Sequence, residues 1–250
     1  MVIVREAAWG SALDRLRHNR DMARLSFILL LVLPALVLAQ AVDPRLERDG
    51  WRPMLFDRKP PNVFRATPDR GVEVISEGGV SLLQRPVSVD LETTPILAWR
   101  WRVDQAVPAT DLSVRGEDDR SLAIYVTFPF EPGKATWFER MGRGVVEAIA
   151  GSDAPGRLLA YVWGGAHELG AMVESPYYGD AGKLVILRPA GTPNGSWRME
   201  RVDLQADYRA AFGSDPPNPT HLAIAADSDD TGSTARGWVE GLQFLPHEAN

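Results

Sequence analysis

Apolar and polar side chains alternate along residues 95–104, whose sequence is Pro-Ile-Leu-Ala-Trp-Arg-Trp-Arg-Val-Asp. A period of two residues is that of a β-strand, because successive side chains of a strand point to opposite faces of the sheet. We expect the face with Trp99 and Trp101 to pack on a core, since each indole buries a large area. The face with Arg100 and Arg102 is expected to meet water, carboxylates or an anionic ligand.

Short apolar runs recur along the chain and are separated by stretches rich in Gly and Pro. Besides residues 96–103, they cover 51–56, 62–66, 71–76, 80–84, 122–128, 158–163, 171–174, 183–188, 197–202, 221–226 and 237–244. Many short strands between turn residues predict a mainly β fold, an antiparallel β-sandwich of the jelly-roll, lectin-like or galactose-binding-like kind. Apolar residues at helical spacing add one or two short helices, over 134–150 and 204–212.

The first 41 residues follow a different pattern. Residues 1–21 are charged, and we interpret them as an upstream extension from a start codon assigned too early. Residues 22–41 combine Arg24, an apolar run over 25–38 and a small-x-small ending, Ala39-Gln40-Ala41, as a cleavable signal peptide does. The alternative, a membrane anchor, needs a longer run than this one, which Pro34 interrupts. We therefore expect a periplasmic or secreted protein without a stable transmembrane anchor, and a single domain over 42–250.

Composition excludes several classes of site and partner. The chain has 27 Lys and Arg against 33 Asp and Glu, and its formal charge is −6. Because no basic stripe is present, nucleic acid is not an expected partner. The absence of Cys rules out disulfides, thiolate zinc sites and cysteine nucleophiles.

Several motifs, in their order and spacing, resemble one family of exported bacterial proteins, domain-of-unknown-function family 3047. They include Ala98-Trp99-Arg100-Trp101-Arg102-Val103, Glu117-Asp118-Asp119, Tyr161-Val162-Trp163, Asp207-Tyr208-Arg209 and Asp227-Ser228-Asp229-Asp230-Thr231-Gly232. The resemblance covers nearly all residues after the signal peptide. It implies export but no established activity. Residues 134–150 depart from it, because the resemblance implies a shorter link between strands there.

A first group of candidate ligand-binding residues depends on which strands are neighbours. If the strand over 122–128 lies beside the strand over 96–103, Asp118 and Asp119 come close to Arg100 and Arg102, and Tyr125 shares the arginine face. Such a face would bind a sugar or an acidic glycan. The alternative is an arginine–carboxylate network that joins the two strands, since paired charges are often structural.

A second group lies on other predicted strands. Tyr161 and Trp163 share one face, where they would stack on sugar rings or pack in the core, as Trp usually does. Glu200 would form a glycosidase carboxylate pair with Asp207, or be solvated or paired with an arginine. The candidate ligand-binding residues are therefore Arg100, Arg102, Asp118, Asp119, Tyr125, Tyr161, Trp163 and Glu200.

The turn after residues 221–226 carries the candidate metal ligands Asp227, Asp229, Asp230 and Thr231, with calcium as the candidate ion. Alternate oxygen ligands before a glycine resemble the start of an EF-hand loop, but its twelfth position is Trp238 and not Glu, so only a looser calcium turn remains. An aspartate-nucleophile phosphatase would need a downstream lysine, and no lysine follows Thr231. The remaining alternative is a turn capped by its own side chains.

These observations favour a binding protein over an enzyme. The chain has no His-Glu-x-x-His or Gly-x-Ser-x-Gly motif. Our preferred hypothesis is a non-catalytic protein that binds carbohydrate or another cell-envelope ligand, with no cofactor other than the candidate calcium. One alternative is a glycan hydrolase or lyase that uses Asp118, Asp119, Glu200 or Asp227. The other is an envelope scaffold without a small ligand.

Overall fold

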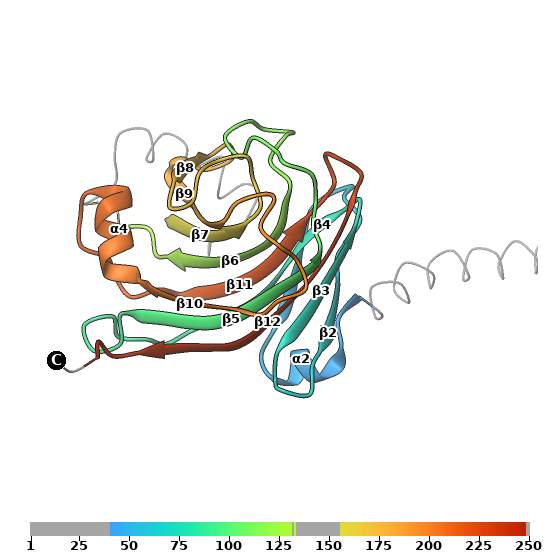
Figure 1. Cartoon of the computed structure of the whole chain (residues 1–250). Helices are drawn as coiled ribbons and strands as arrows, with labels where there is room; N and C mark the ends of the chain where they lie inside the picture. Colours follow the sequence, from blue (N-terminus) through green and yellow to red (C-terminus); the bar gives the residue numbers. More distant parts are fainter. Residues whose placement is uncertain (1–40, 132, 134–155, 249–250) are drawn as a thin grey trace, which may run out of the picture. The chain divides into compact units, whose positions relative to one another are not determined.

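Strand β5 (Ile96–Gln105), which carries the two neighbouring tryptophans, lies inside a five-stranded sheet of order β10-β5-β12-β3-β2 (Figure 1). The other strands are β10 (Arg198–Asp203), β12 (Thr234–Leu245), β3 (Val72–Glu77) and β2 (Val63–Ala66). All neighbouring pairs in this sheet are antiparallel. The structure is a computed structural model that describes residues 41–131, 133 and 156–248, and the statements below refer to these residues.

The second sheet has seven strands in the order β1-β4-β11-β6-β7-β9-β8. They are β1 (Arg52–Leu55), β4 (Val80–Pro86), β11 (His221–Asp227), β6 (Arg120–Phe128), β7 (Arg157–Trp163), β9 (Gly179–Arg188) and β8 (Met172–Ser175). The pair β7–β9 is parallel and the other pairs are antiparallel. The parallel pair arises because the chain passes from β7 to the edge strand β8 and returns as β9 between them.

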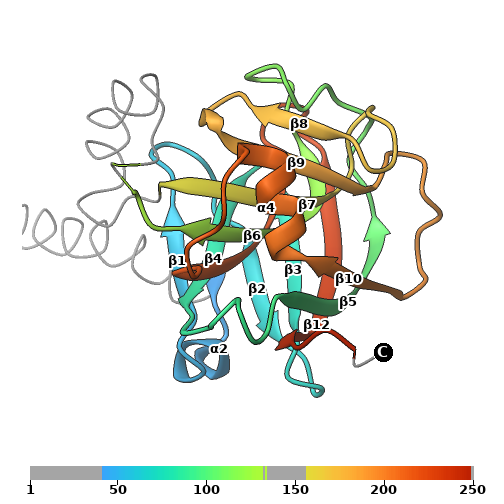
Figure 2. The same cartoon turned by 90° about the vertical axis from the view of Figure 1, so that its left-hand side faces the viewer.

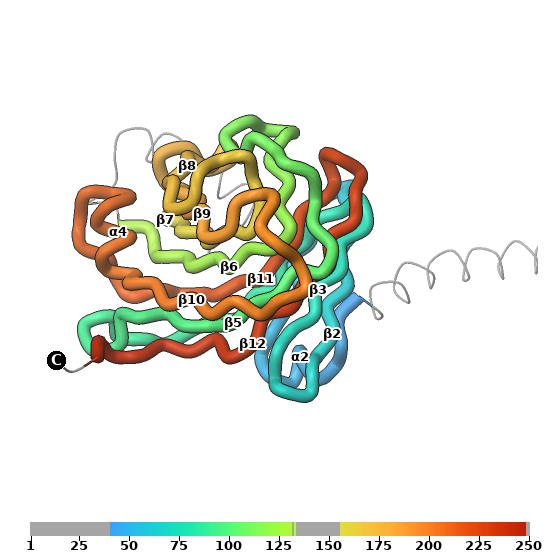
Figure 3. The backbone as a smooth tube through the Cα atoms, in the orientation of Figure 1, coloured from blue at the N-terminus to red at the C-terminus, as the bar shows by residue number. Residues whose placement is uncertain are grey.

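The two sheets pack as a sandwich around an aromatic core (Figure 3). Trp101 is fully buried, and its ring lies edge-on to Trp99 and Trp163, with centroids 5.5 Å and 5.6 Å away. Edge-on aromatic pairs contribute about 0.5–1.5 kcal/mol each beyond the area that they bury. Arg100, between the two tryptophans in sequence, is exposed on the other face. The predicted division of this strand into a core face and a polar face is therefore confirmed.

The central strands of the seven-stranded sheet are buried on both faces, whereas the edge strands β1 and β8 are partly exposed. Every residue of β7 is buried, and a second apolar cluster forms on the face away from the sandwich core. Its members include Leu112, Tyr125, Val162 and Ile186. Strands buried on both sides read as nearly continuous apolar runs, as β7 does.

Two short helices accompany the sheets in the described part of the chain, α2 (Pro44–Arg48) and α4 (Leu204–Phe212). Helix α4, beside β9 and β10 in Figure 2, begins after Asp203, whose carboxylate accepts the N–H groups of Gln205 and Ala206. It ends at Gly213, whose φ of 67° is the left-handed conformation that glycine adopts at little cost. The predicted helix over 204–212 is thus present, and the one over 134–150 lies outside the described residues. None of the described helices is long and apolar enough to cross a membrane.

The structure confirms the mainly β sandwich, and it corrects one expected pairing. Strands β5 and β6 belong to different sheets, because β5 pairs with β10 and β12 whereas β6 pairs with β7 and β11. Tyr125 therefore does not share a face with Arg100 and Arg102. Periodicity identifies the two faces of each strand, but it does not identify the neighbours of that strand.

Candidate functional site

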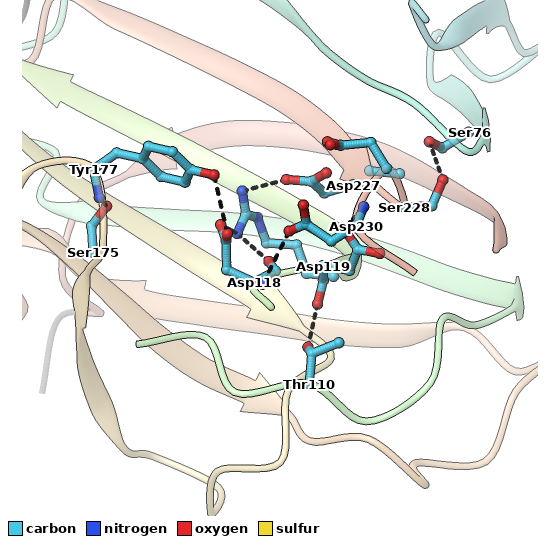
Figure 4. A network of polar contacts seen from close by, with 12 residues as sticks. Ser76, Thr110, Asp118, Asp119, Ser175, Tyr177, Asp227, Ser228 and Asp230 are labelled. Atoms are coloured by element: carbon cyan, nitrogen blue, oxygen red, sulfur yellow. Dashed lines mark hydrogen bonds and ion pairs between the residues drawn. The ribbon is translucent and has the colours of Figure 1, made fainter. Parts of the chain in front are cut away.

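Five aspartates gather at one end of the seven-stranded sheet, because β6 begins where β11 ends. Arg120, the first residue of β6, is the antiparallel partner of Asp227, the last residue of β11. The Asp118-Asp119 step before β6 and the turn over 228–231 after β11 therefore lie side by side (Figure 4). We call Asp118, Asp119, Asp227, Asp229 and Asp230 the acidic cluster.

Arg120 forms the base of this cluster. Its guanidinium is buried and donates to Asp227 Oδ2 at 2.8 Å, to Asp118 Oδ2 at 3.1 Å and to the Tyr125 hydroxyl at 2.8 Å. Burial lowers the pKa of Arg120, but Tyr125, Asp227 and Asp118 outweigh that effect and raise it. The guanidinium thus stays charged and links the end of β11 to the start of β6.

Asp119 holds the turn over 228–231 from the neighbouring segment. Its fully buried carboxylate accepts the N–H groups of Asp230 and Thr231, at 3.2 Å and 2.8 Å, and the Thr231 hydroxyl at 2.6 Å. Ser228, also fully buried, lies 2.8 Å from the Ser76 hydroxyl. Asp119 thus caps two N–H groups of the turn from another segment, whereas within the turn Thr231 Oγ1 accepts the N–H of Ser233 at 3.4 Å. The turn is therefore capped both from outside and by one of its own side chains.

Asp227 is the carboxyl group of the cluster whose pKa is raised most clearly. Burial raises the pKa of Asp227 to about 8 despite the opposing charge of Arg120, and the nearby Asp229 carboxylate adds to this effect. Burial and Asp229 also raise the pKa of Asp230. Lys59 forms an ion pair with Asp229 and supplies the second positive charge of the site.

Tyr177, in the connection between β8 and β9, lies at the rim of the acidic cluster. Its hydroxyl donates to Asp118 Oδ1 at 3.2 Å, and the Arg115 guanidinium lies 4.7 Å from the ring centroid. Burial and Asp118 raise the pKa of Tyr177 to about 12, so the hydroxyl is protonated at neutral pH. The residue nevertheless remains 50% exposed. It therefore offers aromatic surface to a ligand beside the carboxylates.

The structure unites the predicted metal residues with three of the predicted ligand-binding residues. Asp118, Asp119 and Tyr125 lie with the turn that carries Asp227, Asp229, Asp230 and Thr231. The two groups were predicted as separate sites, and they form one.

Arg100 and Arg102 lie outside this cluster, on the outer face of the five-stranded sheet. Arg100 pairs with Glu240 at 2.6 Å and lies 4.9 Å from the ring centroid of Trp197. Arg102 lies 4.3 Å from the ring centroid of Trp238. We call this surface the arginine–tryptophan face. Its arginines have carboxylate partners other than Asp118 and Asp119, as the separation of β5 from β6 requires.

Tyr161, Trp163 and Glu200 have structural roles. Tyr161 and Trp163 are buried in the sandwich core, so they form no exposed platform, and the core-packing alternative accounts for them. Glu200 accepts the Trp101 indole N–H at 2.8 Å and the Arg188 Nε–H at 2.7 Å. It joins β10 to β9 and does not form a carboxylate pair with Asp207, which accepts the Tyr161 hydroxyl instead.

Sequence reasoning missed Arg120, Tyr177 and Lys59. The sequence did contain a signal for Arg120, which follows two aspartates directly and precedes an apolar run. If that run is buried, the arginine is buried too and needs charged partners. Tyr177 and Lys59 come from connections distant in sequence from the other members, and no local pattern marks them.

Comparison with known proteins identifies a family. The family model described as "Protein of unknown function (DUF3047)" matches residues 49–243, which confirms the resemblance of the motifs. No curated protein matches the chain. Among solved structures, the xyloglucanase domain of NopAA, a type three effector from Sinorhizobium fredii in complex with cellobiose, is similar with a TM-score of 0.42 and 9% identity, over 80% of this chain and 95% of that chain. Similarity at that level supports no inference about function.

The raised pKa of Asp227 predicts how stability depends on pH. An unfolded Asp releases its proton near pH ~4, whereas folded Asp227 keeps it up to about pH 8. The folded state thus binds more protons in this interval, and the free energy of unfolding should fall as pH rises through it. Asp227→Asn should flatten that slope in urea titrations between pH 5 and 8 with a chelator present. The exposed Asp57→Asn is the control, and equal slopes for wild type and Asp227→Asn would refute the assignment.

Proposed function

The chain belongs to the DUF3047 family, and we propose that it is an exported, non-catalytic binding protein that takes a carbohydrate of the cell envelope at the acidic cluster. The observation that carries the proposal is the half-exposed ring of Tyr177 beside fixed carboxylates. A sugar presents an apolar face of C–H groups and a rim of hydroxyl donors. Binding sites for such molecules combine an aromatic surface with a few well-placed polar groups.

The negative charge of the acidic cluster limits which carbohydrates it can bind. Five aspartates lie with the cations Arg120 and Lys59, and Arg115 lies at the rim beside Tyr177. Asp227 keeps its proton at neutral pH because its pKa is raised, so four carboxylates carry the negative charge. Arg120 is buried and already shared between Asp118 and Asp227, so it is not free to bind an anion. Carboxylates accept hydrogen bonds from hydroxyl or ammonium groups and repel carboxylates and sulfates. The proposed ligand is therefore a neutral or amino sugar, and the acidic glycan considered from the sequence is disfavoured at this cluster.

One observation favours a second candidate function, cleavage of the glycan. A carboxyl group that stays protonated beside ionised ones is the arrangement of a general acid, and the raised pKa of Asp227 fits that role. A general acid must also reach the atom that it protonates. Asp227 is only 6% exposed, and one of its oxygens accepts from Arg120. Binding without catalysis is therefore the better account.

Glycan binding tests the site. We expect the domain to bind neutral or amino-sugar glycans on an array, and Tyr177→Ala to weaken binding at least tenfold by calorimetry, equivalent to a loss of about 1.4 kcal/mol. Trp197→Ala, on the arginine–tryptophan face, is the matched control and should bind as wild type. If Trp197→Ala lost binding and Tyr177→Ala did not, the binding site would lie on the arginine–tryptophan face instead. Shortened glycans in the mixture would refute the non-catalytic role, and no binding to any glycan would favour the scaffold alternative.

Export is part of the same proposal and has its own test. The leader over residues 22–41 should be removed, so that the mature protein begins at Val42, which forms a bridge with Phe64 in the folded domain. The intact mass of protein recovered from the periplasm or medium should match residues 42–250. A main species that retains residues 25–38 would contradict cleavage.

A further inference from the structure

The acidic cluster contains an acceptor without a donor. Asp227 Oδ2 accepts from Arg120, but no donor in the described part of the chain reaches Asp227 Oδ1, which is buried. The side chain of Asp227 is only 9% exposed, so water has little access to it. The neighbouring carboxyl group of Asp229 contributes to the raised pKa of Asp227. Two acidic groups thus lie close together, and either a retained proton or a bound cation relieves their repulsion.

Three other carboxylate oxygens of the acidic cluster converge on one another. One oxygen each from Asp119, Asp229 and Asp230 lies within 4.8 Å of the others. They come from two segments, since Asp119 precedes β6 whereas Asp229 and Asp230 follow β11. Figure 4 shows Asp119, Asp227 and Asp230 in one network of polar contacts. The Asp227 oxygen without a donor and the converging oxygens of its neighbours both leave negative charge in the cluster without a cation beside it.

The donor set indicates which ion would fit. All four groups offer carboxylate oxygens, and hard cations such as calcium prefer oxygen ligands. Softer ions such as zinc are usually held by nitrogen or sulfur ligands, which this group lacks. Calcium tolerates irregular geometry, whereas magnesium demands a near-ideal octahedron. The proposed ligands come from two separate segments, and calcium suits such a set because it tolerates irregular geometry.

Lys59 is the group that a cation would displace. Its ammonium pairs with Asp229, and its side chain is 44% exposed, so it can move into solvent. The Thr231 hydroxyl donates to Asp119, and Asp119 is one of the three residues whose carboxylate oxygens converge. We propose that Asp119, Asp227 Oδ1, Asp229 and Asp230 bind one calcium ion in competition with Lys59. Asp119 thereby replaces Thr231 in the ligand set predicted from sequence.

Calcium titration of chelator-treated protein, without any glycan, tests the proposal separately from carbohydrate binding. With a Kd of about 1 mM, ~10 mM calcium should raise the Tm by about 3–5 °C, because the ion binds only the folded state. Sodium chloride at matched ionic strength should not do so. Asp229→Asn should lose the rise, and the exposed Asp57→Asn should keep it.

Lys59→Met gives the sharper result, because it removes a competitor and leaves every proposed ligand in place. Its calcium Kd by calorimetry should be at least threefold lower than that of wild type. A Tm unchanged up to ~10 mM calcium in both wild type and Lys59→Met would overturn the proposal. An equal rise in sodium chloride, or in Asp229→Asn, would overturn it as well.

Discussion

The buried guanidinium of Arg120 is the interaction on which the candidate site depends. It binds Asp227 on β11 and Asp118 before β6 at the point where the two strands meet. Buried ions are costly, and a buried charge left without its partner costs about 3–5 kcal/mol. Removing Arg120 is therefore expected to be costly. The pair of strands ends in a rigid base, on which Asp119 fixes the turn that presents Asp229 and Asp230.

Charged groups in this sandwich divide into two sets with different consequences. On the arginine–tryptophan face, Arg100 pairs with Glu240 and Arg236 pairs with Glu73, so the positive charges are locally balanced. At the acidic cluster, carboxylates outnumber cations, and one oxygen of Asp227 has no donor among the described residues. Buried negative charge without enough cations distinguishes the candidate ligand site from a structural network. Carbohydrate hydroxyls, calcium and Lys59 can each interact with the carboxylates that lack a partner.

The local sequence pattern predicted most strands and helices of this fold. It did not predict which strands are neighbours, and the candidate site depends on that pairing. Alternation along 95–104 located β5 and its buried face, and Asp203 with Gly213 delimits α4 where helical spacing placed it. Nothing local shows that β6 lies in the other sheet, which is why Arg100 and Asp118 were expected together. The sequence pattern also did not decide whether Tyr161 and Trp163 are buried or exposed, because it does not show that β7 is covered on both faces. Lys59 reaches the site from a turn far away in the sequence.

The central claim is that Arg120 and Asp227 are energetically coupled at the base of the site. A double-mutant cycle in urea unfolding tests it most directly, with Arg120→Leu, Asp227→Asn and the double variant. Arg120→Leu alone should cost about 3–5 kcal/mol, because it leaves buried carboxylates without their cation. Adding Asp227→Asn should recover part of this cost, with a coupling energy of about 0.5–3 kcal/mol. Strictly additive costs would contradict the account.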